Sequence, residues 1–252
     1  MRSRHVRGTT VGAHALPLSA LDVSSVIWFL FLMMTFDVIA YHSRFAEYSL
    51  SASVSAQRRA WLEHMANREL RHFDAILLTS LSQSNAFFAS TSVLGIGGLA
   101  AIMGSGDSPR RMLEKLPIVV ETPASLWEIK ILFLISILIY AFFKFAWAFR
   151  LSHYTAIMFG AMAEMGSADK ATIKTHATHT ARLLDLIGHH ANSGLRSFYY
   201  AFAAISWLFH PVIFILASTL VFLILLRREF FSKAARIFNE AKATSFSKPT
   251  ND

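Results

Sequence analysis

Four apolar stretches, separated by polar and charged segments, dominate the pattern of this chain. They cover residues 23–41, 82–106, 126–149 and 199–226. A bilayer core about 30 Å thick requires about 20 mostly apolar residues in a helix, and each stretch is close to that length or exceeds it. The pattern therefore predicts an all-α integral membrane bundle of about four transmembrane helices.

The last stretch is the most apolar of the four. Between Ala201 and Leu226 it contains 16 Leu, Ile, Val and Phe residues, which favour insertion by roughly 5–10 kcal/mol at about 0.3–0.6 kcal/mol each. The only interruptions are His210 and Pro211, and membrane helices tolerate a proline kink. We therefore expect one continuous spanning helix over 199–226.

Amphipathic helices are expected to connect the apolar stretches. Residues 57–73 set a few apolar side chains against many charges, and residues 167–196 form a second polar helix that leads into the fourth span. A short link rich in glycine and proline covers 104–125. The apolar segment at 154–165 is too short to cross the membrane, so it either continues the third helix or lies in the interface.

Polar segments flank the transmembrane domain of residues 22–232. The leader, residues 1–21, carries three arginines, and a polar tail covers residues 233–252. An Arg-bearing segment with few acidic residues is typical of transit peptides, but an unstructured leader has the same composition. Cleavage of the leader is therefore left open.

Composition supports the membrane assignment. The chain is 54% hydrophobic and 16% charged, whereas soluble domains carry about 25% charged residues. It has no cysteine, which excludes disulfides, thiolate zinc sites and iron–sulfur clusters. Its net charge of +8 comes from cations at the edges of the apolar stretches, which is typical of residues beside lipid headgroups. The bilayer, and not nucleic acid, is the expected partner.

With four predicted spans, the numbers of lysines and arginines do not determine which side of the protein faces the cytoplasm. With four spans both chain ends lie on one side, and the two sides carry 12 and 10 Lys and Arg residues. The positive-inside rule counts these cations, and this difference is too small to decide. The cluster that starts at Arg227 and Arg228 slightly favours a cytoplasmic C-terminus.

The second apolar stretch has a face of small residues. At 100° per residue these residues lie within about 60° of one another: Ser80, Ser84, Thr91, Gly95 and Gly98. Small side chains permit close approach and hydrogen bonds between membrane helices. The face predicts a packing seam, with a substrate groove as the alternative.

A polar stripe marks the entry to the fourth span. His189, Asn192, Arg196 and Tyr199 share one side of a straight helix. A polar stripe that runs into the bilayer must face protein or water, because polar groups facing lipid are costly. It is a candidate ligand or ion site, and the alternative is a network that anchors the helix at the membrane surface.

Two further ionisable residues interrupt apolar stretches. Asp37 lies in the first span and Lys144 in the third. A lysine at the bilayer centre costs about 2.5–3.5 kcal/mol on insertion scales, and such residues are often functional. Lys144 either snorkels to the interface, carries a function or pairs with Asp37, its expected partner if the spans alternate.

Eleven histidines raise the question of a metal or haem. His176 and His179 have a workable ligand spacing on a helix, and interfacial histidines from two helices could bind a haem axially. No carboxylate completes a metal site near that pair, and no hydrolase, zincin, P-loop or dinucleotide-binding motif occurs. The sequence thus specifies no cofactor.

Several strings in the chain are typical of one family. They are FFASTS (87–92), LWEIK (126–130), YAFFKF (140–145), GHHANSGLR (188–196), HP (210–211) and RREF (227–230). Together they resemble domain-of-unknown-function family 599, uncharacterised multi-pass membrane proteins of bacteria and plants. The resemblance covers about residues 22–232. It implies a multi-pass membrane protein and supplies no reaction, ligand or catalytic residue.

Three functional classes remain at this point. The leading expectation is a non-enzymatic accessory or scaffold subunit of the bacterial inner membrane, associated with other membrane subunits. The alternative is a small transporter or channel that uses the intramembrane polar residues. The third is a haem- or metal-binding redox subunit.

Overall fold

The computed structural model describes residues 18–68, 70–163 and 169–246, and the regular structure in them is entirely helical. The α-helices are α1 (Ala20–His42), α2 (Leu50–Ala66), α3 (His72–Gly104), α4 (Ser108–Leu113), α5 (Ala124–Gly160), α6 (Lys170–Ile205), α7 (Pro211–Phe231) and α8 (Lys233–Phe246). Two short 3-10 helices cover Ala46–Tyr48 (η1) and Ser206–Leu208 (η2). The all-α prediction is confirmed.

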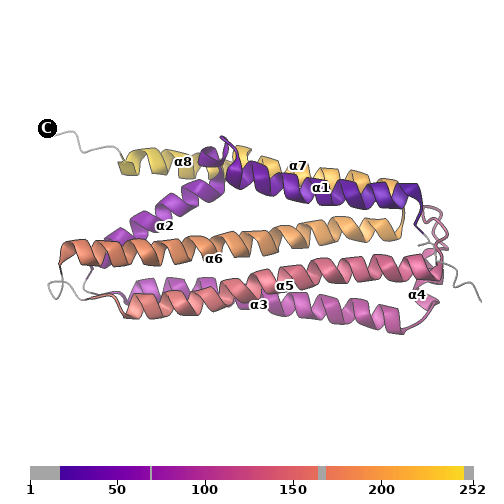
Figure 1. The fold of residues 1–252 in the computed structure, drawn as a ribbon, viewed down its shortest axis with the longest axis horizontal. Coiled ribbons are helices and arrows are strands. Elements are labelled where there is room, and N and C mark those ends of the chain that lie inside the picture. Colours follow the sequence, from indigo (N-terminus) through magenta and orange to yellow (C-terminus); the bar gives the residue numbers. More distant parts are fainter. Residues whose placement is uncertain (1–17, 69, 164–168, 247–252) are drawn as a thin grey trace, which may run out of the picture.

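Four described helices are long and apolar enough to cross a membrane. They are α1, α3, α5 and the segment Pro211–Ala241, which begins with α7. Along the long axis of the molecule, α1 and α7 run side by side in one layer, and α3 and α5 run side by side in another (Figure 1). Helix α6 lies between the two layers and contacts both α5 and α7.

The long helices differ in length, and this difference divides the molecule into a membrane bundle and an extension of it. Helices α1 and α7 have 23 and 21 residues, about 35 and 32 Å at 1.5 Å per residue. Helices α3, α5 and α6 have 33, 37 and 36 residues, about 50–55 Å. Their extra length lies at the end where α1 and α7 stop and α2 begins (Figure 1). We call this extension, which is formed by α2 and residues 72–84, 148–160 and 170–192, the outer body.

The membrane bundle and the outer body each have a buried core. The core of the membrane bundle is rich in aromatic rings: Phe29, Phe36, Tyr200, Trp207 and Phe214. The core of the outer body consists of aliphatic residues: Leu62, Met65, Leu78, Leu151, Ile173, Leu184 and Ile187 with several alanines. The molecule is therefore a membrane bundle with a small helical body continuous with one end.

The predicted continuous span over 199–226 is wrong. Helix α6 ends at Ile205, η2 follows, and α7 starts at Pro211 in the opposite direction. Proline favours the first turn of a helix and forces the preceding residue into an extended conformation, and His210 has φ −157° and ψ 137°. The His210 ring then accepts a hydrogen bond from the Val212 backbone N–H at 3.0 Å. The total hydrophobicity of residues 199–226 predicts that they insert into the membrane, but it does not show that the chain reverses direction before Pro211.

The connecting segments also differ in detail from the sequence prediction. The first amphipathic helix covers Leu50–Ala66 instead of 57–73. Its N-cap is Ser49, whose side chain accepts a hydrogen bond from the Ala52 N–H. The segment from 154 onward continues the third helix, since α5 extends to Gly160. The polar tail forms α8 as far as residue 246. The leader lies outside the described residues up to residue 17.

Helix α6 joins the predicted second connecting helix to the start of the predicted fourth span. Its first half belongs to the outer body, and its second half runs the length of the membrane bundle beside α5. Because α6 adds a further passage, α1 begins at one end of the bundle and α8 lies at the other (Figure 1). The counts of 12 and 10 cations were made for a chain that begins and ends on the same side of the membrane. Because α1 begins at one end of the bundle and α8 lies at the other, those counts do not apply.

Candidate functional site

The polar stripe of α6 faces α1, α2 and α7. Its four residues reach different partners. His189 and Asn192 line a cavity, Arg196 contacts α1, and Tyr199 contacts α7. Sequence periodicity thus placed the stripe on one side of the helix, and in the structure this side is directed toward neighbouring helices, with His189 and Tyr199 exposed.

Arg196 of the stripe forms an ion pair with Asp37 of α1. Arg196 Nη2 donates to Asp37 Oδ1 at 2.7 Å, and Arg196 Nη1 donates to the Tyr41 hydroxyl at 3.1 Å. The guanidinium also stacks near the rings of Phe36 and Tyr41, 5.1 and 5.4 Å from their centroids. The Arg196 side chain is 8% exposed. A charge this deep requires a partner, and α1 supplies one.

The expected pair between Asp37 and Lys144 is wrong. Asp37 binds Arg196 instead, while the Lys144 ammonium lies 5.1 Å from the centroid of the Tyr140 ring, four residues earlier on α5. The Tyr140 hydroxyl is 3.3 Å from Ser193 Oγ on α6. Lys144 is half-buried and is stabilised by an aromatic face instead of a carboxylate.

Tyr199 links α6 to the end of α7. Arg228 Nη1 donates to the Tyr199 hydroxyl at 3.3 Å, and the guanidinium lies 5.3 Å from the ring centroid. An arginine and a tyrosine at the end of an apolar helix are typical of the headgroup level. For Tyr199 the structure therefore favours the anchoring interpretation.

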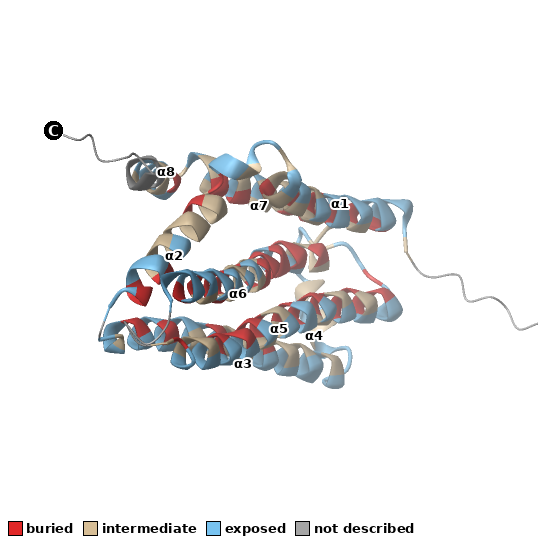
Figure 2. Cartoon of the chain, turned by 60° about the vertical axis from the view of Figure 1, so that its left-hand side comes forward, coloured by how far each residue is buried: buried red, intermediate tan, exposed pale blue. Residues whose placement is uncertain are grey.

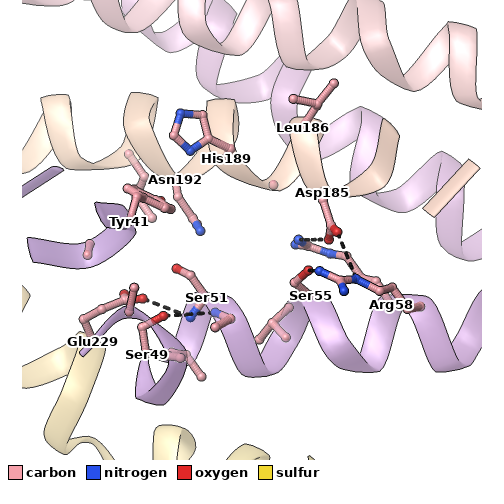
Figure 3. Close-up of a pocket in the computed structure, with 18 of the residues that line it drawn as sticks. Tyr41, Ser49, Ser51, Ser55, Arg58, Asp185, Leu186, His189, Asn192 and Glu229 are labelled. Atoms are coloured by element: carbon pink, nitrogen blue, oxygen red, sulfur yellow. Dashed lines mark hydrogen bonds and ion pairs between the residues drawn. The ribbon is translucent and has the colours of Figure 1, made fainter. Parts of the chain in front are cut away.

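A cavity of about 820 Å³ lies between α2 and α6, next to the last turns of α1 and α7. Figure 3 shows its walls: α2 with Ser51, Ser55 and Arg58 along one side, and α6 with Asp185, His189 and Asn192 along the other. The charged residues on its lining are Arg58, Arg59, Arg182, Arg228, Asp185 and Glu229.

Contacts at both ends of the cavity hold α2 against the bundle. At one end, buried Glu229 accepts a hydrogen bond from the Ser51 backbone N–H at 2.9 Å (Figure 3). At the other, Asp185 Oδ1 lies 3.7 Å from Arg58 and Asp185 Oδ2 lies 3.6 Å from Arg59. Burial lowers the pKa of Arg58 below its usual value, and the Asp185 carboxylate offsets part of that shift. Arginine stays protonated at physiological pH even so.

Gly188 permits the close approach of α2 to α6. A Cβ placed on Gly188 would overlap the Arg58 guanidinium, far inside van der Waals contact of Nη1. The cavity, Arg58, Arg59 and Glu229 were not predicted from the sequence. The GHH string that starts at Gly188 was a usable signal, because a glycine inside a helix often marks a close packing contact.

A second charged cluster lies at the opposite end of the membrane bundle. The Trp207 indole donates to Asp22 Oδ1 at 2.9 Å, and Lys130 Nζ lies 5.6 Å from the Trp207 ring centroid. Asp22 and Lys130 are 4% and 3% exposed. Sequence reasoning missed this cluster, because both charged residues lie at the very ends of apolar stretches, where charges are ordinary.

Two of the described histidines contact a backbone carbonyl and an aromatic ring. His176 Nε2 lies 2.7 Å from the Met158 carbonyl oxygen, and the His189 ring packs edge-on against Tyr41 with centroids 4.6 Å apart. Within residues 18–68, 70–163 and 169–246, no group of three or more His, Asp or Glu residues is arranged to hold a metal ion.

One family model matches most of the chain. It is described as "Protein of unknown function, DUF599" and covers residues 24–234. The chain belongs to this family. The DUF599 region contains the polar stripe, the cavity and all helices from α2 to α7, so these features belong to the family domain and not to the leader or tail. No curated protein and no solved structure matches the chain.

Proposed function

We propose that this DUF599 protein is a non-enzymatic accessory or scaffold subunit of the bacterial inner membrane, which associates with other membrane helices through α3. The observation that carries this proposal is the uncovered face of α3. Only four of the 33 residues of α3 are buried: Asp74, Leu78, Asn85 and Ser92. Figure 2 shows exposed residues along most of this helix.

The uncovered face of α3 includes polar and small side chains. Ser80, Gln83 and Ser84, which lie at the outer-body end of α3, are exposed, and a Cβ built on Gly98 in the membrane bundle would meet nothing within 4 Å. Of the predicted small-residue seam, Gly95 packs closely within the chain, since Leu138 Cδ1 would lie 2.8 Å from its Cβ. Small residues permit close contact between membrane helices. A partner helix packed along α3 would use the open space at Gly98 in the membrane bundle and would reach the exposed Ser84 at the edge of the outer body.

The distribution of cations supports a cytoplasmic position for the outer body. At that end of the bundle lie Arg44, Arg58, Arg59, Arg68, Arg71, Arg150, Lys170, Lys174, Arg182, Arg227, Arg228, Lys233 and Arg236. At the opposite end the described residues carry Arg110, Arg111, Lys115 and the buried Lys130. Lys and Arg accumulate on the cytoplasmic side of inner-membrane proteins. We therefore propose that the outer body faces the cytoplasm.

Cysteine cross-linking tests the association, because the chain has no cysteine of its own. We expect Ser84→Cys and Gly98→Cys to give cross-linked species in native membranes, either with a second copy or with a stoichiometric partner. Leu220→Cys on the exposed face of α7 is the control, and it should give far less product. Equal cross-linking at all three positions, or a lone protomer after mild detergent extraction, would remove the basis for this function.

A small transporter or channel is the second candidate. It is favoured by the Arg196–Asp37 pair of the membrane bundle, in which the arginine is buried and the carboxylate is partly exposed, a single helical turn from Asn192 on the cavity lining. Intramembrane charged residues often mark ion or substrate pathways. Proteoliposome flux measurements test this candidate: any flux should fall in a variant that combines Arg196→Gln with Lys144→Gln. Unchanged flux in that variant would eliminate it.

A further inference from the structure

The cavity between α2 and α6 lies at the level where the membrane-crossing helices end. Ala40 and Tyr41 belong to the last turn of α1, and Arg228 and Glu229 belong to the last turn of α7. Arginine and tyrosine side chains at the ends of apolar helices mark the headgroup region. The cavity is therefore placed between the hydrocarbon core and the water around the outer body.

The lining of the cavity has more cationic than anionic groups. Four arginines face two carboxylates, and Glu229 is already engaged by the Ser51 backbone N–H. Asp185 is shared between two arginines: its Oδ1 lies 3.7 Å from Arg58 Nη1, and its Oδ2 lies 3.6 Å from Arg59 Nε. Both distances are longer than a direct charge-assisted hydrogen bond, which measures about 2.7–2.9 Å. The guanidiniums therefore retain donors for an additional anion.

Arg59 and Arg182 are the arginines most available to a ligand. The Arg59 side chain is 64% exposed, and Arg182 is exposed and has no ion pair among the described residues. One arginine comes from α2 and the other from α6, so an anion between these helices can contact both. The planar guanidinium matches phosphate geometry and can bind it through two parallel hydrogen bonds.

An aliphatic surface lies beside these charges. Leu50 and Val54 of α2 and Leu186 and Leu195 of α6 line the same cavity. Leu195 is next to Arg196, whose partner Asp37 lies inside the membrane bundle. A hydrocarbon chain of an anionic ligand can therefore extend from the arginines toward the lipid, and a volume of about 820 Å³ is in the range of small-molecule sites, about 300–1,000 Å³.

We propose that this cavity is a binding site for a phosphate ester, with Arg59 and Arg182 as anion contacts and Leu186, Leu195 and Val54 along the hydrocarbon. Basic pockets between membrane helices on the cytoplasmic side are known to hold anionic lipid headgroups. The ligand chemistry has two sources, an anionic phospholipid of the surrounding leaflet or a soluble phosphate ester. The site is separate from the uncovered face of α3, so it does not depend on the proposed scaffold function.

Native mass spectrometry of the full-length protein in detergent tests the site. The probes are phosphatidylglycerol and, as a zwitterionic reference, phosphatidylcholine. We expect the wild-type protein to retain phosphatidylglycerol preferentially, and the double variant R59Q/R182Q to bind it at least about tenfold more weakly, since each hydrogen bond to a charged group is worth about tenfold or more. The matched control is R111Q/K115Q, which removes two cations from the opposite end of the bundle.

Competition with sn-glycerol 3-phosphate distinguishes the two sources of the ligand. If the soluble ester displaces phosphatidylglycerol at comparable concentration, the phosphate alone supplies the affinity; if it does not, the lipid is the ligand. Loss of binding in R59Q/R182Q with an unchanged unfolding temperature supports the site in either case, and R182Q alone should give a smaller loss in the same direction. Absence of any preference for phosphatidylglycerol, or an equal loss in R111Q/K115Q, would overturn the proposal.

Discussion

The membrane bundle and the outer body use the same helices but stabilise them in different ways. In the membrane bundle the core is aromatic, and the outside is apolar as well: Met34 and Leu216 are 70% and 64% exposed. In the outer body the core is aliphatic, and exposed cations such as Arg59 and Arg182 lie on the outside. Lipid gives no hydrophobic driving force for helix association, so packing and polar contacts must supply it, whereas water drives burial in the outer body.

Helix α6 shows this difference within one element. In its first half the buried positions include large aliphatic side chains, as at Ile173, Leu184 and Ile187. In its second half small residues are buried at Ser193, Gly194 and Ser197, and the Phe145 ring lies so close that a Cβ on Gly194 would be 2.7 Å from it. Small residues are buried along the whole of α6, but its buried large aliphatic side chains are confined to the half that lies in the outer body.

The largest expected effect is the difference in stability lost when an ion pair is broken in the membrane bundle and when one is broken in the outer body. Asp37→Ala leaves the Arg196 guanidinium, 8% exposed, without a carboxylate that is itself 43% exposed. Loss of the partner of a buried charge costs about 3–5 kcal/mol, and the exposure of Asp37 places the expected loss at the lower end of that range. Asp185→Ala removes a carboxylate whose partners Arg58 and Arg59 are 23% and 64% exposed in the outer body, where screening limits the loss to about 1 kcal/mol or less. Thermal or denaturant unfolding in detergent measures both variants. Equal losses would show that the two regions share one solvent environment.

Much of the fold could be predicted because apolar run length determines membrane crossing. The four apolar helices and the common side of His189, Asn192 and Arg196 were accessible from period and composition. The reversal at His210 was missed because insertion energy is insensitive to the direction of the chain. Asp37 was assigned to Lys144 because the sequence gives depth in the membrane but not which neighbouring helix lies at that depth. The cavity depends on how α2 packs against α6, which no local pattern encodes.

The next effect tests whether the outer body has a core of its own. Leu184 is 3% exposed and packs in the aliphatic cluster, so Leu184→Ala should destabilise the outer body by about 2–5 kcal/mol through lost burial and a cavity. Hydrogen exchange should then increase at α2 and the first half of α6 and remain unchanged at the aromatic core. Uniformly faster exchange in both cores would contradict the division into two regions.

A smaller effect is expected when an exposed apolar residue is replaced by arginine, and its size should differ between the two regions. Leu220 at the centre of α7 and Ile157 near the end of α5 are 59% and 68% exposed. Leu220→Arg should cost about 3 kcal/mol of insertion free energy, because this position faces the hydrocarbon, whereas Ile157→Arg should cost close to nothing in the outer body. The yield of protein in the membrane fraction reports both, and a large loss with Ile157→Arg would extend the hydrocarbon boundary into the outer body.

The smallest expected effect concerns the packing of α2 on α6. In Gly188→Ala the new methyl group must displace the end of the Arg58 side chain, which otherwise occupies that position. Because a guanidinium at the end of a flexible chain can move, we expect a loss of about 1 kcal/mol, at the lower limit for overpacked sites, together with loss of the Arg58–Asp185 contact at 3.7 Å. Arg58→Lys in the same background offers a smaller head group and should restore some of the stability. If Gly188→Ala were instead as costly as Asp37→Ala, the α2–α6 contact would be as rigid as the membrane core, and the outer body would not be the weaker of the two regions.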